Sequence, residues 1–297
     1  MAEPIMIPMD KPPKVLLLGN GLLRAAGGDG WDQLLKKIGT QDTEAEFVRE
    51  TPVVLRTELL CGTDVEKIRN SVAEQIKTAD VSKLPRLRQL LAMDWDCILT
   101  TNYAYEVEEI LLGKEFTKTR RKKAVTNLRD GTSRQDNVQL CYTIERKGHK
   151  PVQVWHIHGD VGRPSTLTLS HYSYAKAISR LLEMNAARKN AYQEHQEAGK
   201  DLQAASWLDW FIMGDVHCMG FGFDFAEFDI WWAIERKARE NARHGDLYCH
   251  LTDQHTAKAK LLERMGAKVE VAEVADWDGH YARALANIEK KWGPGPC

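Results

Sequence analysis

The stretch DCILTTNYAYEVEEILL, residues 96–112, decides the fold class of this 297-residue chain. Its first residues form a short apolar run that predicts a buried strand, and apolar residues at helical spacing predict a helix over 103–112. The polar triplet Thr100, Thr101 and Asn102 separates the two. A strand that passes into a helix through a short polar loop is the repeating unit of α/β folds with parallel sheets.

Five further apolar runs have the same character and alternate with segments of helical spacing. The predicted strands lie in residues 15–19, 152–158, 215–223, 246–253 and 268–274. The predicted helices lie in residues 31–38, 64–78, 84–93, 226–242, 256–265 and 280–292. Near-continuous apolar strands between helices indicate a sheet that is buried on both faces. We therefore expect an α/β fold with a doubly wound, mostly parallel, Rossmann-like sheet and helical insertions.

The pattern predicts one large domain over residues 14–292, with helical insertions at about 41–93 and 173–211. The two ends of the chain contain prolines among short apolar runs or glycines. We expect residues 1–13 and 293–297 to be flexible segments.

Charge in this sequence is balanced, with 41 Lys and Arg residues against 42 Asp and Glu residues and a formal net charge of −1. This balance argues against nucleic acid or an anionic membrane surface as a direct partner. Residues 114–150 are mostly polar and rich in charge, which predicts a long flexible excursion with room for one hairpin.

Two further sequence features bear on location and metal content. No apolar run approaches the ~18 residues that a membrane span needs, and the N-terminus lacks the apolar core of a signal peptide, so we expect a cytoplasmic protein. The six cysteines include no C-x-x-C pair. They therefore predict reduced, mostly buried thiols, and we expect no bound metal.

Four of the predicted strands end in residues that suit a ligand site. The carboxyl ends of parallel strands meet at one edge of a sheet, where open α/β folds bind ligands. The candidates are Gly19, Asn20, Gly21 and Arg24 after the first strand, Thr101, Asn102 and Tyr103 after the second, His158 and Gly159 after the third, and Gly220, Phe221, Gly222 and Asp224 after the fourth.

Each of these loops also has a purely structural interpretation. Gly19 and Gly21 suit either a tight turn or close approach to a phosphate, and Arg24 stands where a dinucleotide-binding fingerprint needs its third glycine. Asn102 can be a helix N-cap, and Asp224 or Asp229 can either cap the next helix or bond a ribose hydroxyl. Single motifs therefore leave the choice open.

The order of these four motifs along the chain favours a ligand site over a purely structural role. A glycine turn followed by AGGDGWDQLL, then TTNY, then HG, then GFGFD resembles the sirtuin-like family, in particular its bacterial NAD-consuming branch associated with antiphage defence. The resemblance covers most of residues 15–235. It implies that Asn102 and His158 are the catalytic pair, and that His156 points to the opposite side, toward the core. It also implies that the glycine loop and Arg24 hold the pyrophosphate of NAD and that residues 221–224 frame its adenosine.

The same resemblance implies an NAD glycohydrolase that cleaves its substrate NAD to nicotinamide and ADP-ribose as a toxic effector of antiphage defence. Such an effector must be silent until triggered, so we expect a regulatory or sensor subunit, such as a ring ATPase or a nucleotide-processing protein, or a homo-oligomer. Ala104 replaces an aspartate that the family often has, which leaves a non-catalytic NAD or ADP-ribose sensor open. The paired cysteines of the family's zinc module are absent. Their absence weakens, without excluding, an NAD-dependent protein deacylase or ADP-ribosyltransferase.

Overall fold

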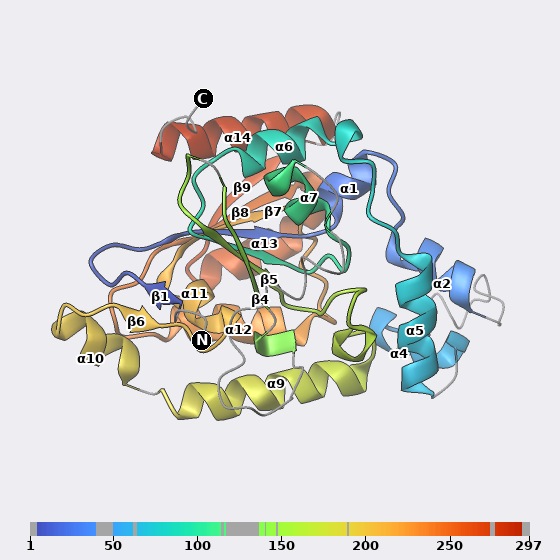
Figure 1. Cartoon of the computed structure of the whole chain (residues 1–297), viewed down its shortest axis with the longest axis horizontal. Coiled ribbons are helices and arrows are strands. Elements are labelled where there is room, and N and C mark those ends of the chain that lie inside the picture. Colours follow the sequence, from blue (N-terminus) through green and yellow to red (C-terminus); the bar gives the residue numbers. More distant parts are fainter. Residues whose placement is uncertain are drawn as a thin grey trace.

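The computed structural model describes residues 5–39, 50–61, 64–113, 116, 137–139, 141–146, 148–188, 190–273 and 277–292. A seven-stranded sheet runs through the centre of the molecule between two layers of helices (Figure 1). Its strands are β2 (Lys14–Leu18), β3 (Cys97–Thr100), β4 (Cys141–Ile144), β5 (Val152–His156), β7 (Asp215–Met219), β8 (Leu247–Thr252) and β9 (Lys268–Ala272).

The strand order in this sheet is β4-β5-β3-β2-β7-β8-β9, and all neighbours are parallel except β4, which is antiparallel to β5. Numbered in chain order, the six parallel strands run 3-2-1-4-5-6, which is the order of the dinucleotide-binding Rossmann fold. The first strand, β2, is central, with Leu16 between Ile98 of β3 and His217 of β7. The predicted α/β fold with a mostly parallel, Rossmann-like sheet is therefore confirmed, and each of its six predicted strands is present.

The helices cover both faces of the sheet because the strands are apolar on both faces. They are α1 (Gly21–Ala25), α2 (Trp31–Ile38), α4 (Val53–Cys61), α5 (Val65–Gln75), α6 (Pro85–Leu91), α7 (Glu106–Leu112), α9 (His171–Ala186), α10 (Ala191–Glu197), α11 (Trp207–Met213), α12 (Phe228–Ala238), α13 (Thr256–Arg264) and α14 (Trp277–Trp292). Val15 and Leu17 of β2 pack in the core that α9 to α13 share, whereas Leu16 and Leu18 pack under α1, α6, α7 and α14 (Figure 1).

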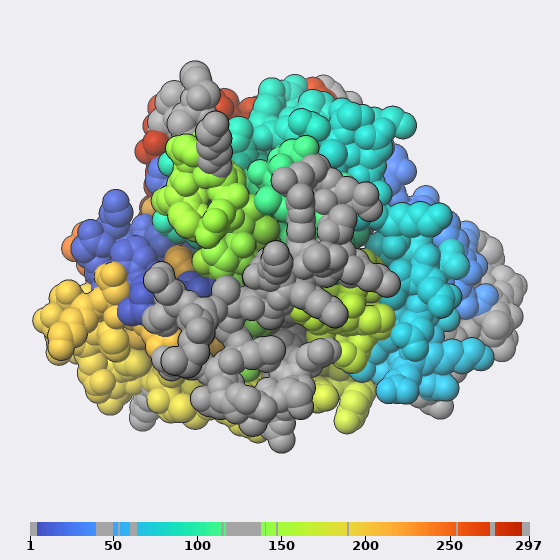
Figure 2. Space-filling model, viewed as in Figure 1, coloured from blue at the N-terminus to red at the C-terminus, as the bar shows by residue number. Residues whose placement is uncertain are grey.

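Three helices, α2, α4 and α5, lie at one edge of the molecule and form what we call the helical module (Figures 1 and 2). Leu34 of α2 and Ile68 and Val72 of α5 form a small core with Leu167 and Leu169, which follow β5 in the chain. This core anchors the helical module beside the carboxyl ends of the strands, where the predicted site residues lie.

Parts of the two segments that we expected to be flexible form strands. Within residues 1–13, Met6–Ile7 forms strand β1, which pairs antiparallel with β6 (Leu202–Gln203), and the side chains of Ile5 and Ile7 are buried. Burial of these side chains compensates for the entropy of ordering the segment. Within residues 114–150, β4 is a buried strand that extends the sheet.

Other expectations fall partly or wholly outside the described residues, among them residues 1–4, 117–136 and the tail at 293–297. No helix in the described ranges is long and apolar enough to cross a membrane. Cys97, Cys141, Cys218 and Cys249 are buried free thiols, as predicted from their spacing.

Candidate functional site

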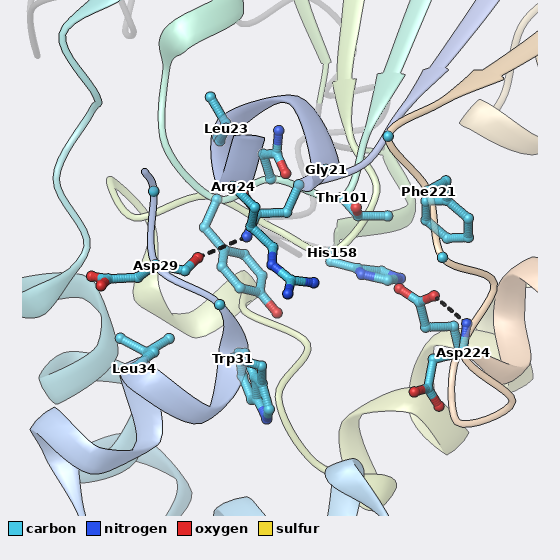
Figure 3. A pocket seen from close by; sticks show the side chains of 18 of the residues that line it. Gly21, Leu23, Arg24, Asp29, Trp31, Leu34, Thr101, His158, Phe221 and Asp224 are labelled. Atoms are coloured by element: carbon cyan, nitrogen blue, oxygen red, sulfur yellow. Dashed lines mark hydrogen bonds between the residues drawn. The ribbon is translucent and has the colours of Figure 1, made fainter. Parts of the chain in front are cut away.

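A cavity of about 550 Å³ lies at the carboxyl ends of β2, β3, β5, β7 and β8 (Figure 3). The strand order reverses between β2 and β7, so the cavity occupies the switch point where doubly wound sheets bind ligands. Trp31 and Leu34 of the helical module line one side, and His280 and Tyr281 of α14 line another.

The loops that follow β2 and β7 pack against each other through their glycines. Gly19 donates its amide to the carbonyl of Met219 at 3.0 Å, and Gly21 donates its amide to the carbonyl of Gly220 at 2.7 Å. A Cβ atom at Gly19 would lie 2.5 Å from the Gly220 carbonyl oxygen, and one at Gly21 would lie 2.6 Å from the Tyr281 hydroxyl. Glycine at these two positions is therefore required by the close contact between the two loops, which agrees with the structural interpretation of the sequence.

The loop after β2 also supplies polar side chains to the cavity. Asn20 and Arg24 line it, and the Asn20 side-chain amide is held by the Asp29 carbonyl at 2.9 Å. The Arg24 guanidinium points into the cavity (Figure 3). Burial raises the pKa of Tyr281 to about 12, and the nearby positive charge of Arg24 opposes this rise only in part. Arg24 thus gives this wall a positive charge.

Asn102 lies just beyond β3 and is held by three hydrogen bonds. Its backbone amide donates to Thr100 Oγ1 at 3.1 Å, its side-chain Nδ2 donates to the Gly19 carbonyl at 3.5 Å, and its carbonyl accepts from His156 Nδ1 at 2.9 Å. Only one of the two Nδ2 hydrogens is engaged by the protein, so Asn102 can offer Oδ1 as an acceptor and its second N–H as a donor to a bound molecule in the cavity.

His158 lines the same cavity and is paired with a buried carboxylate. Its Nε2 lies 3.0 Å from Asp229 Oδ2, and its ring contacts Tyr174 edge-on. Burial alone would lower the pKa of His158, but the Asp229 carboxylate outweighs burial and raises it. Because Asp229 occupies Nε2, Nδ1 is the ring nitrogen through which His158 can act on a ligand.

Asp229 is itself fixed at the start of α12, where its Oδ1 accepts the Ile230 amide at 2.9 Å. Glu227, two residues earlier, lines the cavity and accepts the Asp224 amide at 3.3 Å. Burial raises the pKa of Glu227 to about 7, and the neighbouring charge of His158 partly opposes this rise. The sequence suggested Asp229 only as a cap or a ribose ligand, and no motif identified Glu227.

His156 lies apart from the cavity, fully buried between β3 and α7. The resemblance implied that His156 and His158 point to opposite sides, whereas residues two apart in one strand would share a face. The two histidines differ because β5 ends at His156, and His158 lies in the turn that follows.

All the predicted site residues except Gly19 and Gly159 line the cavity, including Thr101, Tyr103 and the loop 220–224 without Phe223. Gly159 has φ +86°, and a Cβ atom there would lie 2.3 Å from the Thr166 carbonyl oxygen, so it shapes the turn that carries His158. Within the part of the chain that the structure describes, no cluster of three or more His, Cys, Asp or Glu residues is arranged to hold a metal ion.

A comparison with protein families matches residues 96–269 to the SIR2-like domain, which runs from β3 to the start of β9 and includes Asn102, His158 and Asp229. No curated protein matches the chain. SIR2-like domains bind NAD, so the match supports an NAD-utilising enzyme in general. Because the match spans more than half of the sequence and the fold agrees with it, this chain belongs to the SIR2-like domain family.

Proposed function

We propose that the protein is an NAD glycohydrolase that cleaves NAD to nicotinamide and ADP-ribose. The observation that carries the proposal is the convergence of Asn102 and the His158–Asp229 pair on one cavity at the switch point of the sheet. A volume of about 550 Å³ is within the ordinary range for sites that bind small molecules and cofactors.

The proposed roles follow from the geometry of these side chains. Asn102 Oδ1 orients the ribose of the substrate or the attacking water. The bond between the ribose carbon and the nicotinamide nitrogen breaks, nicotinamide leaves as a neutral molecule, and the water oxygen bonds to the same carbon. His158 Nδ1 accepts the proton that water loses, and Asp229 stabilises the imidazolium that results.

The cavity walls fit the rest of a dinucleotide. We propose that Arg24 pairs with the pyrophosphate, whose negative charge matches its guanidinium, and that Phe221, Gly222 and Asp224 contact the adenosine. Ala104 carries no carboxyl group, but Glu106 lines the cavity nearby and supplies one on the same side. That carboxyl group favours a catalytic site over a non-catalytic sensor.

The wider role rests on the sequence resemblance. We propose a toxic effector of bacterial antiphage defence, inactive until a regulatory subunit or a change of assembly releases it. A ring ATPase or nucleotide-processing protein remains the proposed class of partner.

Nicotinamide release from NAD tests the function directly. The purified chain, alone and with neighbouring gene products, is incubated with NAD, with and without an acyl-lysine peptide. Release without peptide is expected, whereas release only with peptide would indicate a deacylase, and binding without release would indicate a sensor. His158→Ala should abolish release, and His195→Ala, at a half-buried position of α10 that does not line the cavity, is the matched control that should not.

A further inference from the structure

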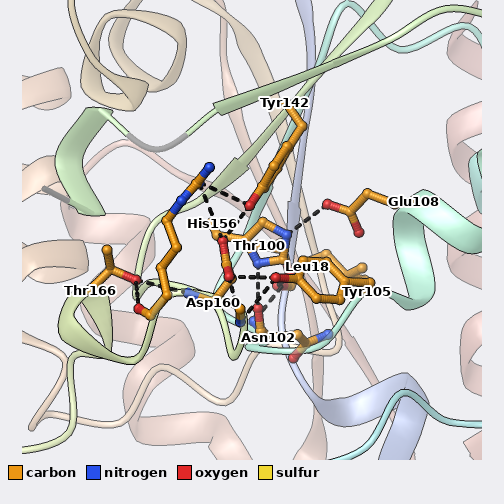
Figure 4. Close-up of polar contacts among 11 residues, drawn as sticks. Leu18, Thr100, Asn102, Tyr105, Glu108, Tyr142, His156, Asp160 and Thr166 are labelled. Carbon is orange, nitrogen blue, oxygen red and sulfur yellow. Dashed lines mark hydrogen bonds and ion pairs between the residues drawn. The ribbon is translucent and has the colours of Figure 1, made fainter. Parts of the chain in front are cut away.

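Behind the cavity lies a second histidine–carboxylate pair that the proposed reaction does not use. His156 and Glu108 are both fully buried, with His156 Nε2 at 2.7 Å from Glu108 Oε1 (Figure 4). The other ring nitrogen, Nδ1, donates to the backbone carbonyl of Asn102 at 2.9 Å. One imidazole thus joins helix α7 to the loop that carries Asn102.

The surroundings of this pair suggest that stability alone does not explain it. The rings of Tyr105 and Tyr142 contact the imidazole edge-on, each with a centroid distance of 5.7 Å. Glu108 Oε2 is buried and has no hydrogen-bond partner among the described residues. A buried ion pair in an aromatic setting is often no more stable than apolar residues of the same volume.

The His156–Glu108 pair holds the backbone carbonyl of Asn102, and Asn102 must keep one orientation to act in the proposed reaction. The Asn102 backbone is held at its amide by Thr100 Oγ1, which in turn donates to the Leu18 carbonyl at 3.2 Å. The imidazole holds the carbonyl on the other side of the same residue. Both sides of the Asn102 backbone are therefore fixed, and with them the direction of its side-chain carboxamide.

The two neighbours of His156 together determine where its ring carries protons. A carbonyl can only accept, so His156 must have a proton on Nδ1. With a carboxylate at Nε2, the imidazolium form carries a proton on both nitrogens and satisfies both neighbours. The other charged groups near the ring are Asp160, which also accepts hydrogen bonds from the Tyr105 and Tyr142 hydroxyls, and Glu106.

We propose that His156 and Glu108 are positioning residues that hold Asn102 in its reactive orientation. This inference rests on the proposed hydrolysis of NAD. It assigns no contact with substrate to either residue, and it predicts that their loss lowers kcat and leaves NAD binding almost unchanged.

The test removes the pair without leaving a buried charge. His156→Leu combined with Glu108→Met fills the site with apolar side chains of similar size, so the variant should fold, while the Asn102 carbonyl loses its donor. We expect kcat for nicotinamide release to fall about 10- to 100-fold, the usual effect of a small displacement of a reacting group, with KM within about twofold of wild type.

Glu108→Gln is the conservative counterpart. Its side-chain amide can donate to Nε2 of a neutral imidazole whose Nδ1 proton still reaches Asn102, so kcat should stay within about threefold of wild type. If the double variant does not fold, a folded Glu108→Gln that loses more than about tenfold in kcat would overturn the proposal.

A readout independent of catalysis separates this inference from the proposed function. Hydrogen exchange of the peptide that spans residues 97–104 should accelerate in the double variant and stay near wild type in Glu108→Gln. Absence of nicotinamide release from wild type would refute the function alone. Unchanged exchange, or wild-type kcat in the folded double variant, would refute the positioning role.

Discussion

Two histidines only two residues apart, His156 and His158, each pair with a buried carboxylate in different regions of the molecule. His158 and Asp229 stand 3.0 Å apart at the wall of the cavity, whereas His156 and Glu108 stand 2.7 Å apart in the core. The two pairs share their chemistry and differ in access to a ligand. The end of β5 creates this difference, because the backbone leaves the sheet between the two histidines.

Removal of His156 should have the largest effect on the stability of the fold. His156→Ala leaves the carboxylate of Glu108 buried without its partner, and removing one member of a buried pair costs about 3–5 kcal/mol of unfolding free energy. His158→Ala should cost less, about 1–2 kcal/mol, since His158 lines the cavity and water that takes the place of the deleted ring can reach Asp229. Urea unfolding of both variants measures this difference, and equal losses would mean that the two sites are equally buried.

The pH dependence of the unfolding free energy should also distinguish the two pairs, and the expected effect is slightly smaller. Burial lowers the pKa of His156, but the Glu108 carboxylate outweighs burial and raises the pKa from 6.5 to about 9. The pair therefore stabilises the fold fully below pH 6.5, and this contribution is lost as pH rises through 9, a change on the order of 3 kcal/mol.

Glu108→Gln is the control for this dependence, because it removes the charge that raises the pKa. The unfolding free energy of wild type should fall relative to that of Glu108→Gln between pH 6.5 and pH 9. Parallel curves for the two proteins across that window would show that His156 is neutral in the folded state.

His158 should matter more than His156 for turnover, whereas His156 should matter more than His158 for stability. His158→Ala removes the proposed base and should lower kcat at least ~100-fold while NAD still binds. Asn102→Ala should lose as much, and the double variant should be little worse than either, because both residues serve one step. Nicotinamide release at saturating NAD, corrected for folded fraction, is the measurement. Multiplied losses in the double variant would contradict a shared step.

The sequence predicted the fold well because its six parallel strands are short apolar runs between helices. It missed β1 and β6, whose two-residue strands pair between residues 6–7 and 202–203 and have no local pattern. It allowed for a hairpin within residues 114–150 but did not locate β4, a short strand beside a polar segment.

The site was predictable only in part for a similar reason. Asn102 and His158 end strands, which is a local signal. Their supports are remote in sequence, since Asp229 is 71 residues from His158 and Glu108 is 48 residues from His156. Packing of α7 and α12 against the sheet creates both pairs, and a single sequence does not display that packing.

The smallest effect concerns the charge beside His158. After burial and Asp229, the Glu227 carboxylate is a further influence on the pKa of His158, and it raises that pKa. Glu227→Gln should therefore lower the pKa of His158 and move the acidic limb of the pH profile of kcat/KM to lower pH. The sign follows because a base without a neighbouring negative charge loses its proton more readily. Glu235→Gln, on the same helix α12 and half-exposed beside Arg239, is the matched control and should leave the limb in place. An acidic limb that moves to higher pH in Glu227→Gln would mean that Glu227, rather than His158, is the group that must lose a proton for turnover.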